Sequence, residues 1–178
     1  RTLPLADLLR LLREQGEPAD PRTDIDTASL RGRFPRLARV EMRDLAVEGR
    51  NGRSVPARLY RDAAVPAAGR ALVWVHGGAF LGGHLDMPES HWVSMELAAR
   101  GIPVLALDYV KCLGETHFPE PSDDVLAGGR HAVAHPQGLF GLPASGVVLG
   151  GASAGGNLTA GATARLRDAG ESVPAGLV

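Results

Sequence analysis

The stretch VVLGGASAGGN at residues 147–157 decides the fold. An apolar run opens it, and a run typical of a helix, Leu158 to Asp168, follows it. Its centre has the pattern G-x-S-x-G, with Gly151, Ser153 and Gly155 at the fixed positions. Between a strand and a helix this pattern predicts a sharp turn that exposes the serine oxygen, because glycines without a Cβ let strand and helix approach closely. The free N–H groups at the start of the helix then face any negative charge that forms beside the serine.

A second motif supports this interpretation, since in a chain with 23 glycines G-x-S-x-G alone also fits an ordinary tight turn. The apolar run at residues 71–75 predicts a buried strand, and it continues into HGGAF at residues 76–80. An H-G-G loop in this place supplies backbone N–H groups to an oxyanion in lipases and esterases. The two motifs together predict an acyl-transfer site with Ser153 as the nucleophile. The predicted oxyanion donors are the N–H groups of Gly77, Gly78 and Ala154.

These motifs resemble those of hormone-sensitive-lipase-like esterases, the bacterial family IV type, which have the α/β-hydrolase fold. Residues 76–80 and 151–158 carry the resemblance, and Asp108-Tyr109 with Phe118-Pro119 partly matches a third family motif. The similarity extends from about residue 40 to the last residue and corresponds to the first half to two-thirds of a family member. The resemblance implies a serine carboxylester hydrolase acting on small or medium acyl esters through an acyl-enzyme, with no cofactor.

The chain departs from the family at three places. Ala152 stands where an acidic residue usually precedes the serine, and Ala79 replaces a frequent third glycine of the loop. The third motif normally continues as Arg-Leu-Ala-Pro-Glu, whereas residues 110–117 read VKCLGETH, with one residue more. In the family this segment helps to brace the active site, so we expect a remodelled site whose substrate preference does not follow from the resemblance.

The order of predicted elements indicates an α/β fold with a mostly parallel sheet after an N-terminal hairpin. Val40 to Val47 and Ser54 to Tyr60 predict two strands joined through Asn51-Gly52, a strong hairpin signal. Continuous apolar runs at residues 71–75, 102–107 and 147–150 predict strands covered on both faces. Alternation of such strands with helices implies right-handed parallel crossovers.

The helix predictions complete the domain assignment. Leu3 to Arg13 predicts a helix that Gly16 ends, either as part of a family-type cap or packed on the body for stability. Residues 18–35 predict a loop with one turn near residues 27–30. One helix is predicted to start with Asp86 as N-cap and Glu89 three residues later, and to end at Gly101. A later helix is predicted to start with Ser122 as its cap and to be weakened by Gly128-Gly129. We assign residues 1–38 to a cap-like segment and residues 39–178 to the N-terminal part of an α/β-hydrolase domain.

Composition excludes several classes of partner. The 178 residues suit one domain, and a formal net charge of -1 implies no affinity for nucleic acid or membranes. The single cysteine, Cys112, excludes an internal disulfide and favours a cytoplasmic location; we interpret it as an inert thiol. No apolar run reaches the roughly 18 residues of a membrane span. His131 and His135 are four residues apart, but no third metal ligand is apparent, so we predict no metal site.

The remaining members of a catalytic triad are not found after the serine. In α/β-hydrolases the order is Ser, then Asp or Glu, then His, yet no histidine follows Ser153. Asp168 is 15 residues further along a helix, roughly 20 Å away at 1.5 Å per residue. His76 is expected to be a structural member of its loop, and His84 and His91 either touch substrate or have packing roles.

Two explanations fit this missing base. The first is a chain that lacks a C-terminal part of roughly 100 residues or more by family resemblance, and that alone is inactive and poorly soluble. Its partners would be a small-molecule ester and either that C-terminal part or a second copy in a homo-oligomer. The second is a fold that is not catalytic by this route: a ligand-binding hydrolase-like protein, or a lyase or cyclase on the same scaffold.

Overall fold

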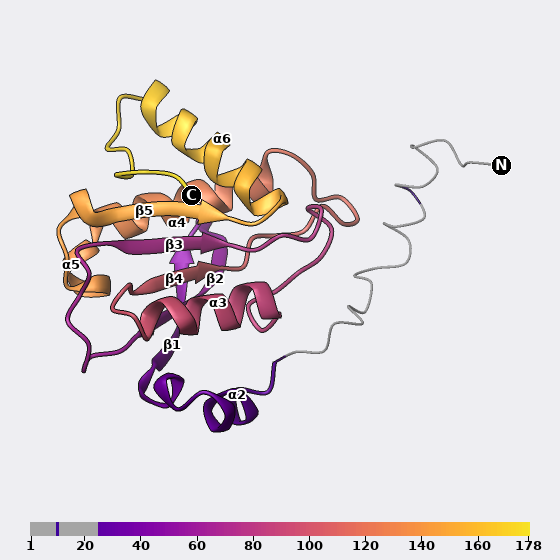
Figure 1. The fold of residues 1–178 in the computed structure, drawn as a ribbon. Helices are drawn as coiled ribbons and strands as arrows, with labels where there is room; N and C mark the ends of the chain where they lie inside the picture. Colours follow the sequence, from indigo (N-terminus) through magenta and orange to yellow (C-terminus); the bar gives the residue numbers. More distant parts are fainter. Residues whose placement is uncertain (1–9, 11–24) are drawn as a thin grey trace.

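The structure is a computed structural model that describes residue 10 and residues 25–178 (Figure 1). The predicted helix from Leu3 to Arg13, apart from Arg10, and its end at Gly16 lie outside the described residues. Most of the predicted cap-like segment 1–38 lies outside them too, so its division from residues 39–178 stays a prediction.

Five strands form one mixed sheet in the order β1-β2-β4-β3-β5 (Figure 1). They are β1 (Glu41–Glu48), β2 (Ser54–Arg61), β3 (Ala71–Val75), β4 (Val104–Leu107) and β5 (Val147–Gly151). β2 runs antiparallel to both β1 and β4, whereas β3 runs parallel to both β4 and β5. The predicted hairpin and the three buried strands are confirmed. β4 begins two residues later than predicted, after Pro103, which has no N–H to donate to a ladder.

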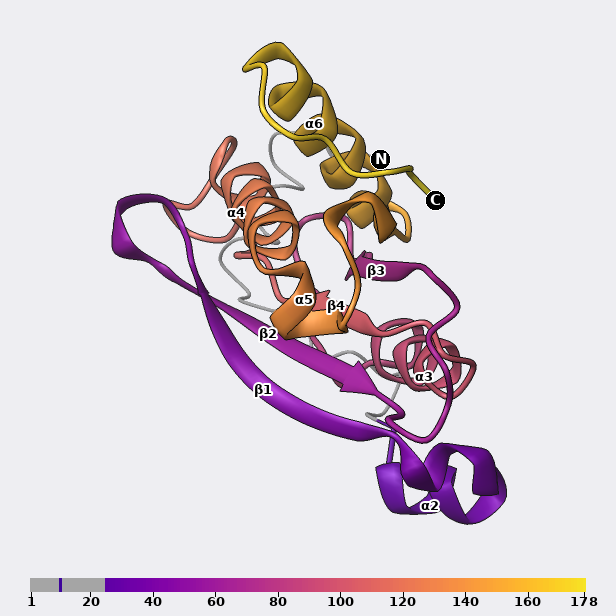
Figure 2. The ribbon, with the colours of Figure 1, turned by 90° about the vertical axis from the view of Figure 1, so that its left-hand side faces the viewer.

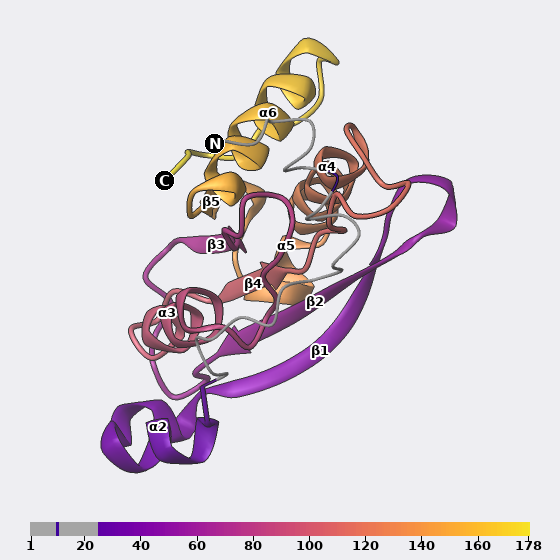
Figure 3. The ribbon, with the colours of Figure 1, turned by 90° about the vertical axis from the view of Figure 1, so that its right-hand side faces the viewer.

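Helices cover both faces of the sheet (Figures 2 and 3). They are α2 (Thr27–Arg33), α3 (Pro88–Ala98), α4 (Glu120–Ala134), α5 (Pro136–Phe140) and α6 (Ala154–Asp168), with 3-10 turns at Pro35–Arg39, Arg50–Gly52 and Ala144–Gly146. α4 and α6 lie on one face, and α3 lies on the other. Side chains of β3 alternate accordingly: Val73 and Val75 pack in the core beneath α4 and α6, and Leu72 packs in the core beneath α3. This two-sided burial explains the continuous apolar strands.

Two predicted helix starts are wrong, because the side chains have long-range partners. α3 has Met87 at its N-cap and no side-chain cap; the Asp86 carboxylate instead accepts from Arg58 Nη1 at 2.5 Å. α4 begins at Glu120, so Ser122 lies within its first turn and accepts a hydrogen bond from Arg165. Both segments have the sequence pattern of a helix cap, but the Asp86 and Ser122 side chains bind arginines from other elements instead of the N–H groups of their own helices.

Two further segments differ in detail from their predictions. The predicted loop at residues 18–35 contains α2, which Asp26 caps by accepting from the N–H groups of Ala28 and Ser29. Gly128, predicted to weaken α4, lets that helix approach β4, because a Cβ there would lie 2.2 Å from Leu107 Cδ1. Glycine at this position lowers the helix propensity of α4 but allows the helix to pack closely on β4.

The last residues pair with the outer edge of β5. Leu177 forms a parallel bridge with Leu149, and the Val178 N–H donates to the Leu149 carbonyl at 3.0 Å. Among the described helices, none has the length and apolarity that a membrane crossing requires.

Candidate functional site

Ser153 occupies a strained turn between β5 and α6. Its φ of 50° and ψ of −116° lie where residues with a Cβ rarely occur, and its side chain is exposed. A Cβ on Gly155 would lie 2.0 Å from the Val75 carbonyl oxygen, and one on Gly151 would lie 2.7 Å from that same atom. The Ala152 N–H donates to this carbonyl at 3.1 Å. The turn is therefore fixed against the end of β3, as the G-x-S-x-G pattern predicts.

The H-G-G loop begins at the end of β3 with a fully buried histidine. His76 Nδ1 lies 2.6 Å from the Gly77 carbonyl oxygen, and Nε2 lies 3.2 Å from Asp108 Oδ1. Its ring stacks on Tyr109, with centroids 4.6 Å apart. Both ring nitrogens face these partners rather than the serine, so His76 is a structural residue of the loop, as expected.

The loop then passes close to the serine. A Cβ on Gly77 would lie 3.3 Å from Ser153 Cβ, which places the two motifs side by side. Gly78, Ala79 and Phe80 follow with φ values of 121°, 55° and 65°, a left-handed run that glycine accommodates best. A Cβ on Gly78 would lie 2.1 Å from the Gly82 carbonyl oxygen, so this position requires glycine.

The three predicted oxyanion donors differ in availability. The Gly77 N–H donates to Glu89 Oε1, so the prediction that Gly77 serves as a donor does not fit this arrangement. Within residues 25–178, the N–H groups of Gly78 and Ala154 show no acceptor, and neither does that of Ala79, next in the same turn. The sequence predicted a capping role for Glu89 and no role for Ala79. The H-G-G motif does not specify in which direction the Ala79 N–H points, so its availability could not be predicted.

The altered third motif still braces the loop. Lys111 Nζ lies 2.5 Å from Asp108 Oδ1, and the Cys112 N–H donates to the Phe80 carbonyl at 2.7 Å. Burial opposes the ionisation of Asp108, but the His76 hydrogen bond and the Lys111 charge outweigh it and hold the pKa of this carboxyl below its ordinary value. The altered segment therefore contacts both the H-G-G loop and the strand end beside it.

An apolar cavity of about 370 Å³ adjoins the two motifs. Its walls come from the loop after Gly78, the segment before α4 and the first turns of α6, and include Phe80, Phe118, Leu158 and Gly161. A larger cavity of about 570 Å³ lies between the end of β1 and α4, and no residue of either motif lines it. The smaller cavity is the one that an apolar group attached to a bound ester could enter.

His91 and the pair of His131 and His135 have structural surroundings. His91 is buried, with Nδ1 2.9 Å from the Tyr60 hydroxyl and Nε2 2.9 Å from Thr27 Oγ1, and burial lowers its pKa. It therefore has the packing role rather than the substrate role. The rings of His131 and His135 lie 4.6 Å apart, and residues 10 and 25–178 contain no group of three or more potential metal-binding side chains.

Comparison with known proteins identifies a matching family and several similar proteins. Residues 72–178 match the model of a family described as having the alpha/beta hydrolase fold. An ethyl acetate hydrolase of Pseudomonas putida is 36% identical over 119 residues, which are 65% of this chain and 36% of that protein. Both sequence motifs lie within the matched family region.

Solved structures agree with the sequence comparison. A hyperthermophilic esterase from the archaeon Pyrobaculum calidifontis superposes with a TM-score of 0.66 at 27% identity, covering 96% of this chain and 55% of that one. A brefeldin A esterase, described as a bacterial homologue of human hormone sensitive lipase, superposes with a TM-score of 0.66 at 28% identity, covering 92% and 42%. The chain thus spans roughly a third to a half of the length of these relatives.

Proposed function

Because the chain belongs to this alpha/beta hydrolase fold family, and within it resembles the hormone-sensitive-lipase-like esterases, we propose that it carries the nucleophile and oxyanion hole of a serine carboxylester hydrolase. The single observation that carries the proposal is the exposed Ser153, held at positive φ at the start of α6 beside the H-G-G loop. Relatives named as ester hydrolases support the same chemistry.

In the proposed reaction, Ser153 Oγ bonds to the carbonyl carbon of the ester and its proton passes to a general base. The carbonyl π electrons move onto oxygen, and the N–H groups of Gly78 and Ala154 stabilise the resulting oxyanion, with that of Ala79 beside them. The oxyanion collapses, the alcohol leaves with the proton, and water then releases the acyl group from Ser153. Each such donor is typically worth about 10²–10³ in rate. The base follows the serine in the sequences of this fold, so activity is tested on the full-length natural protein.

The first experiment treats the full-length natural protein with a fluorophosphonate probe and maps the labelled residue by mass spectrometry. We expect stoichiometric labelling of Ser153, together with hydrolysis of p-nitrophenyl acetate. The exposed Ser145 lies outside both motifs, so Ser145→Ala is expected to label as the wild type does. Absence of labelling and of hydrolysis would favour the alternative of a ligand-binding protein on this fold.

The apolar cavity supports acyl groups of small to medium size as substrates. Gly161 lines it, and a Cβ there would meet no atom within 4 Å, so a larger side chain fits the helix and fills the cavity. We expect Gly161→Leu to lower the ratio of kcat/KM for p-nitrophenyl hexanoate over acetate by roughly tenfold, since one methylene group in a hydrophobic pocket is worth about 10–200-fold. The ratio is measured on the full-length protein.

The matched control is Ala160→Leu, because Ala160 is the neighbouring residue of α6 and faces solvent. This variant is expected to keep the wild-type ratio. An unchanged ratio in Gly161→Leu would show that the acyl chain lies elsewhere. The absence of other partners and the cytoplasmic location stay predictions.

A further inference from the structure

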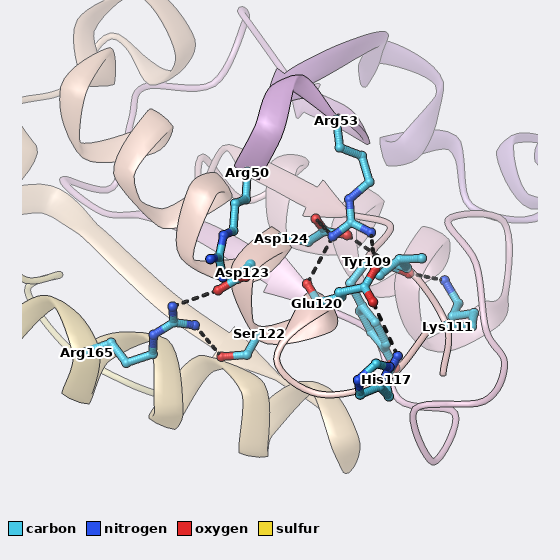
Figure 4. A network of polar contacts seen from close by, with 11 residues as sticks. Arg50, Arg53, Tyr109, Lys111, His117, Glu120, Ser122, Asp123, Asp124 and Arg165 are labelled. Atoms are coloured by element: carbon cyan, nitrogen blue, oxygen red, sulfur yellow. Dashed lines mark hydrogen bonds and ion pairs between the residues drawn. The ribbon is translucent and has the colours of Figure 1, made fainter. Parts of the chain in front are cut away.

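A polar network joins the start of α4 to the β1–β2 hairpin, to α6 and to the segment after β4 (Figure 4). Its centre is a pair of adjacent buried carboxylates, Asp123 and Asp124, which are 5% and 2% exposed. Each is paired with arginine, so both have the contacts of structural ion pairs. Their remaining contacts differ, and this difference indicates different roles.

Asp123 connects secondary-structure elements only. Its Oδ1 lies 2.7 Å from Arg165 Nη2 on α6, and its Oδ2 lies 3.0 Å from Arg50 Nη1 at the hairpin turn. Neither oxygen binds the segment between β4 and α4 within the described part of the chain.

Asp124 connects α4 to that segment. Its Oδ1 lies 2.8 Å from Arg53 Nη2, and its Oδ2 accepts the Val110 N–H at 2.9 Å. Arg53 Nη2 also donates to the Glu120 carbonyl at 3.2 Å, which keeps the guanidinium over the first turn of α4. Val110 is therefore held at a fixed place relative to α4.

Tyr109, the residue before Val110, contacts the peptide group between Gly77 and Gly78 in the H-G-G loop. The Tyr109 hydroxyl donates to the Gly77 carbonyl at 3.2 Å, and the Tyr109 ring stacks on His76, whose Nδ1 lies 2.6 Å from the same carbonyl oxygen. The Gly77 C=O and the Gly78 N–H belong to one planar peptide unit, in which they point in opposite directions. Fixing the direction of the Gly77 carbonyl therefore also fixes the direction of the Gly78 N–H.

We propose that Asp124 is a positioning residue of the oxyanion hole: it holds Val110, Val110 holds Tyr109, and the Tyr109 hydroxyl directs the Gly78 N–H toward the substrate oxygen. This inference rests on the function proposed above, and it adds a residue that the substrate does not touch. Asp123 provides a matched comparison, since it is also buried and pairs with two arginines but lies outside this route.

The test measures kcat and KM of the full-length protein for p-nitrophenyl acetate. Asp124→Ala is expected to lower kcat by about 10²-fold, near the effect of losing one oxyanion donor, with KM within threefold of wild type. Asp124→Asn keeps an oxygen for the Val110 N–H and is expected to retain most of kcat. Asp123→Ala removes two arginine contacts and is expected to keep kcat within threefold.

A double-mutant cycle distinguishes the proposed route through Tyr109 from a non-specific loss of structure around α4. If Asp124 acts through the Tyr109 hydroxyl, then Asp124→Ala combined with Tyr109→Phe lowers kcat much less than the product of the two single effects. Equal losses in the Asp123 and Asp124 variants, or independent effects in the cycle, would overturn the proposal. If Asp124→Ala does not fold, Asp124→Leu replaces it in the cycle, because leucine keeps the branched shape of the side chain but has no acceptor for the Val110 N–H, and the same non-additive effect is expected.

Hydrogen exchange provides a measurement that does not depend on catalysis. Asp124→Ala is expected to speed exchange in peptides covering residues 76–80 and 109–112, and Asp123→Ala is not. An inactive wild type with this contrast would refute the proposed function and leave the positioning intact. An active wild type without the contrast would refute the positioning alone.

Discussion

Replacing Ser153 with alanine is expected to lower kcat/KM of the full-length protein for p-nitrophenyl acetate by about 10⁴-fold or more. Removal of a serine nucleophile costs this much in well-studied hydrolases, and the rate that remains comes from the oxyanion hole and substrate binding alone. Fluorophosphonate labelling is expected to disappear in the same variant. Hydrolysis equal to that of the wild type would eliminate Ser153 as the nucleophile.

A second substitution at this position separates chemistry from backbone strain. Ser153 has φ 50° and ψ −116°, a conformation that costs a residue with a Cβ about 1–3 kcal/mol and glycine much less. Ser153→Gly is therefore expected to be as inactive as Ser153→Ala, yet to have a free energy of unfolding higher by roughly 1 kcal/mol. Urea denaturation of the two variants measures the difference. A less stable glycine variant would show that the turn is not strained.

Gly155→Ala is expected to destabilise the protein by about 3 kcal/mol or more, or to prevent folding. The added Cβ would lie 2.0 Å from the Val75 carbonyl oxygen and 2.6 Å from that of His76, and both are backbone atoms that cannot move aside by a rotamer change. Relief would require α6 to move away from β3, which opens the core between them. Thermal or urea denaturation of the purified variant measures the loss.

Gly161→Ala on the same helix is the control for that experiment. No atom lies within 4 Å of the Cβ that it adds, and alanine is favoured over glycine inside a helix by up to about 1 kcal/mol. Gly161→Ala is thus expected to be neutral or stabilising. Equal stability of the two variants would show that the contact between α6 and β3 does not depend on glycine.

The features that were predictable from sequence are those set by local patterns. β3 and β5 are short continuous apolar runs, and each ends in a glycine motif that adjacent residues of the sequence reveal. The strand boundaries and the positions of Ser153 and His76 could therefore be inferred from adjacent residues.

The features that were not predictable depend on contacts between distant residues. Glu89 has the spacing of a capping-box residue, but the Gly77 N–H, twelve positions away, binds its carboxylate instead. Asp124 reads as a first-turn acid of a helix, and nothing near it in sequence indicates that its partners are Arg53 and Val110. Whether an N–H group is free to bind an oxyanion depends on such pairings. The structure, and not the sequence, therefore shows that the Gly77 N–H is already hydrogen-bonded.

The sheet order has a consequence for how the chain is made. β3 is synthesised before both of its neighbours, and the edge that pairs with β5 has no partner until residues 76–151 have followed it. At about 5–20 residues per second, this interval on the ribosome lasts roughly 4–15 seconds. An apolar strand with an unpaired edge is a template for association with other chains. The growing polypeptide is therefore expected to depend most on chaperones during this interval, before the nucleophile itself has been translated.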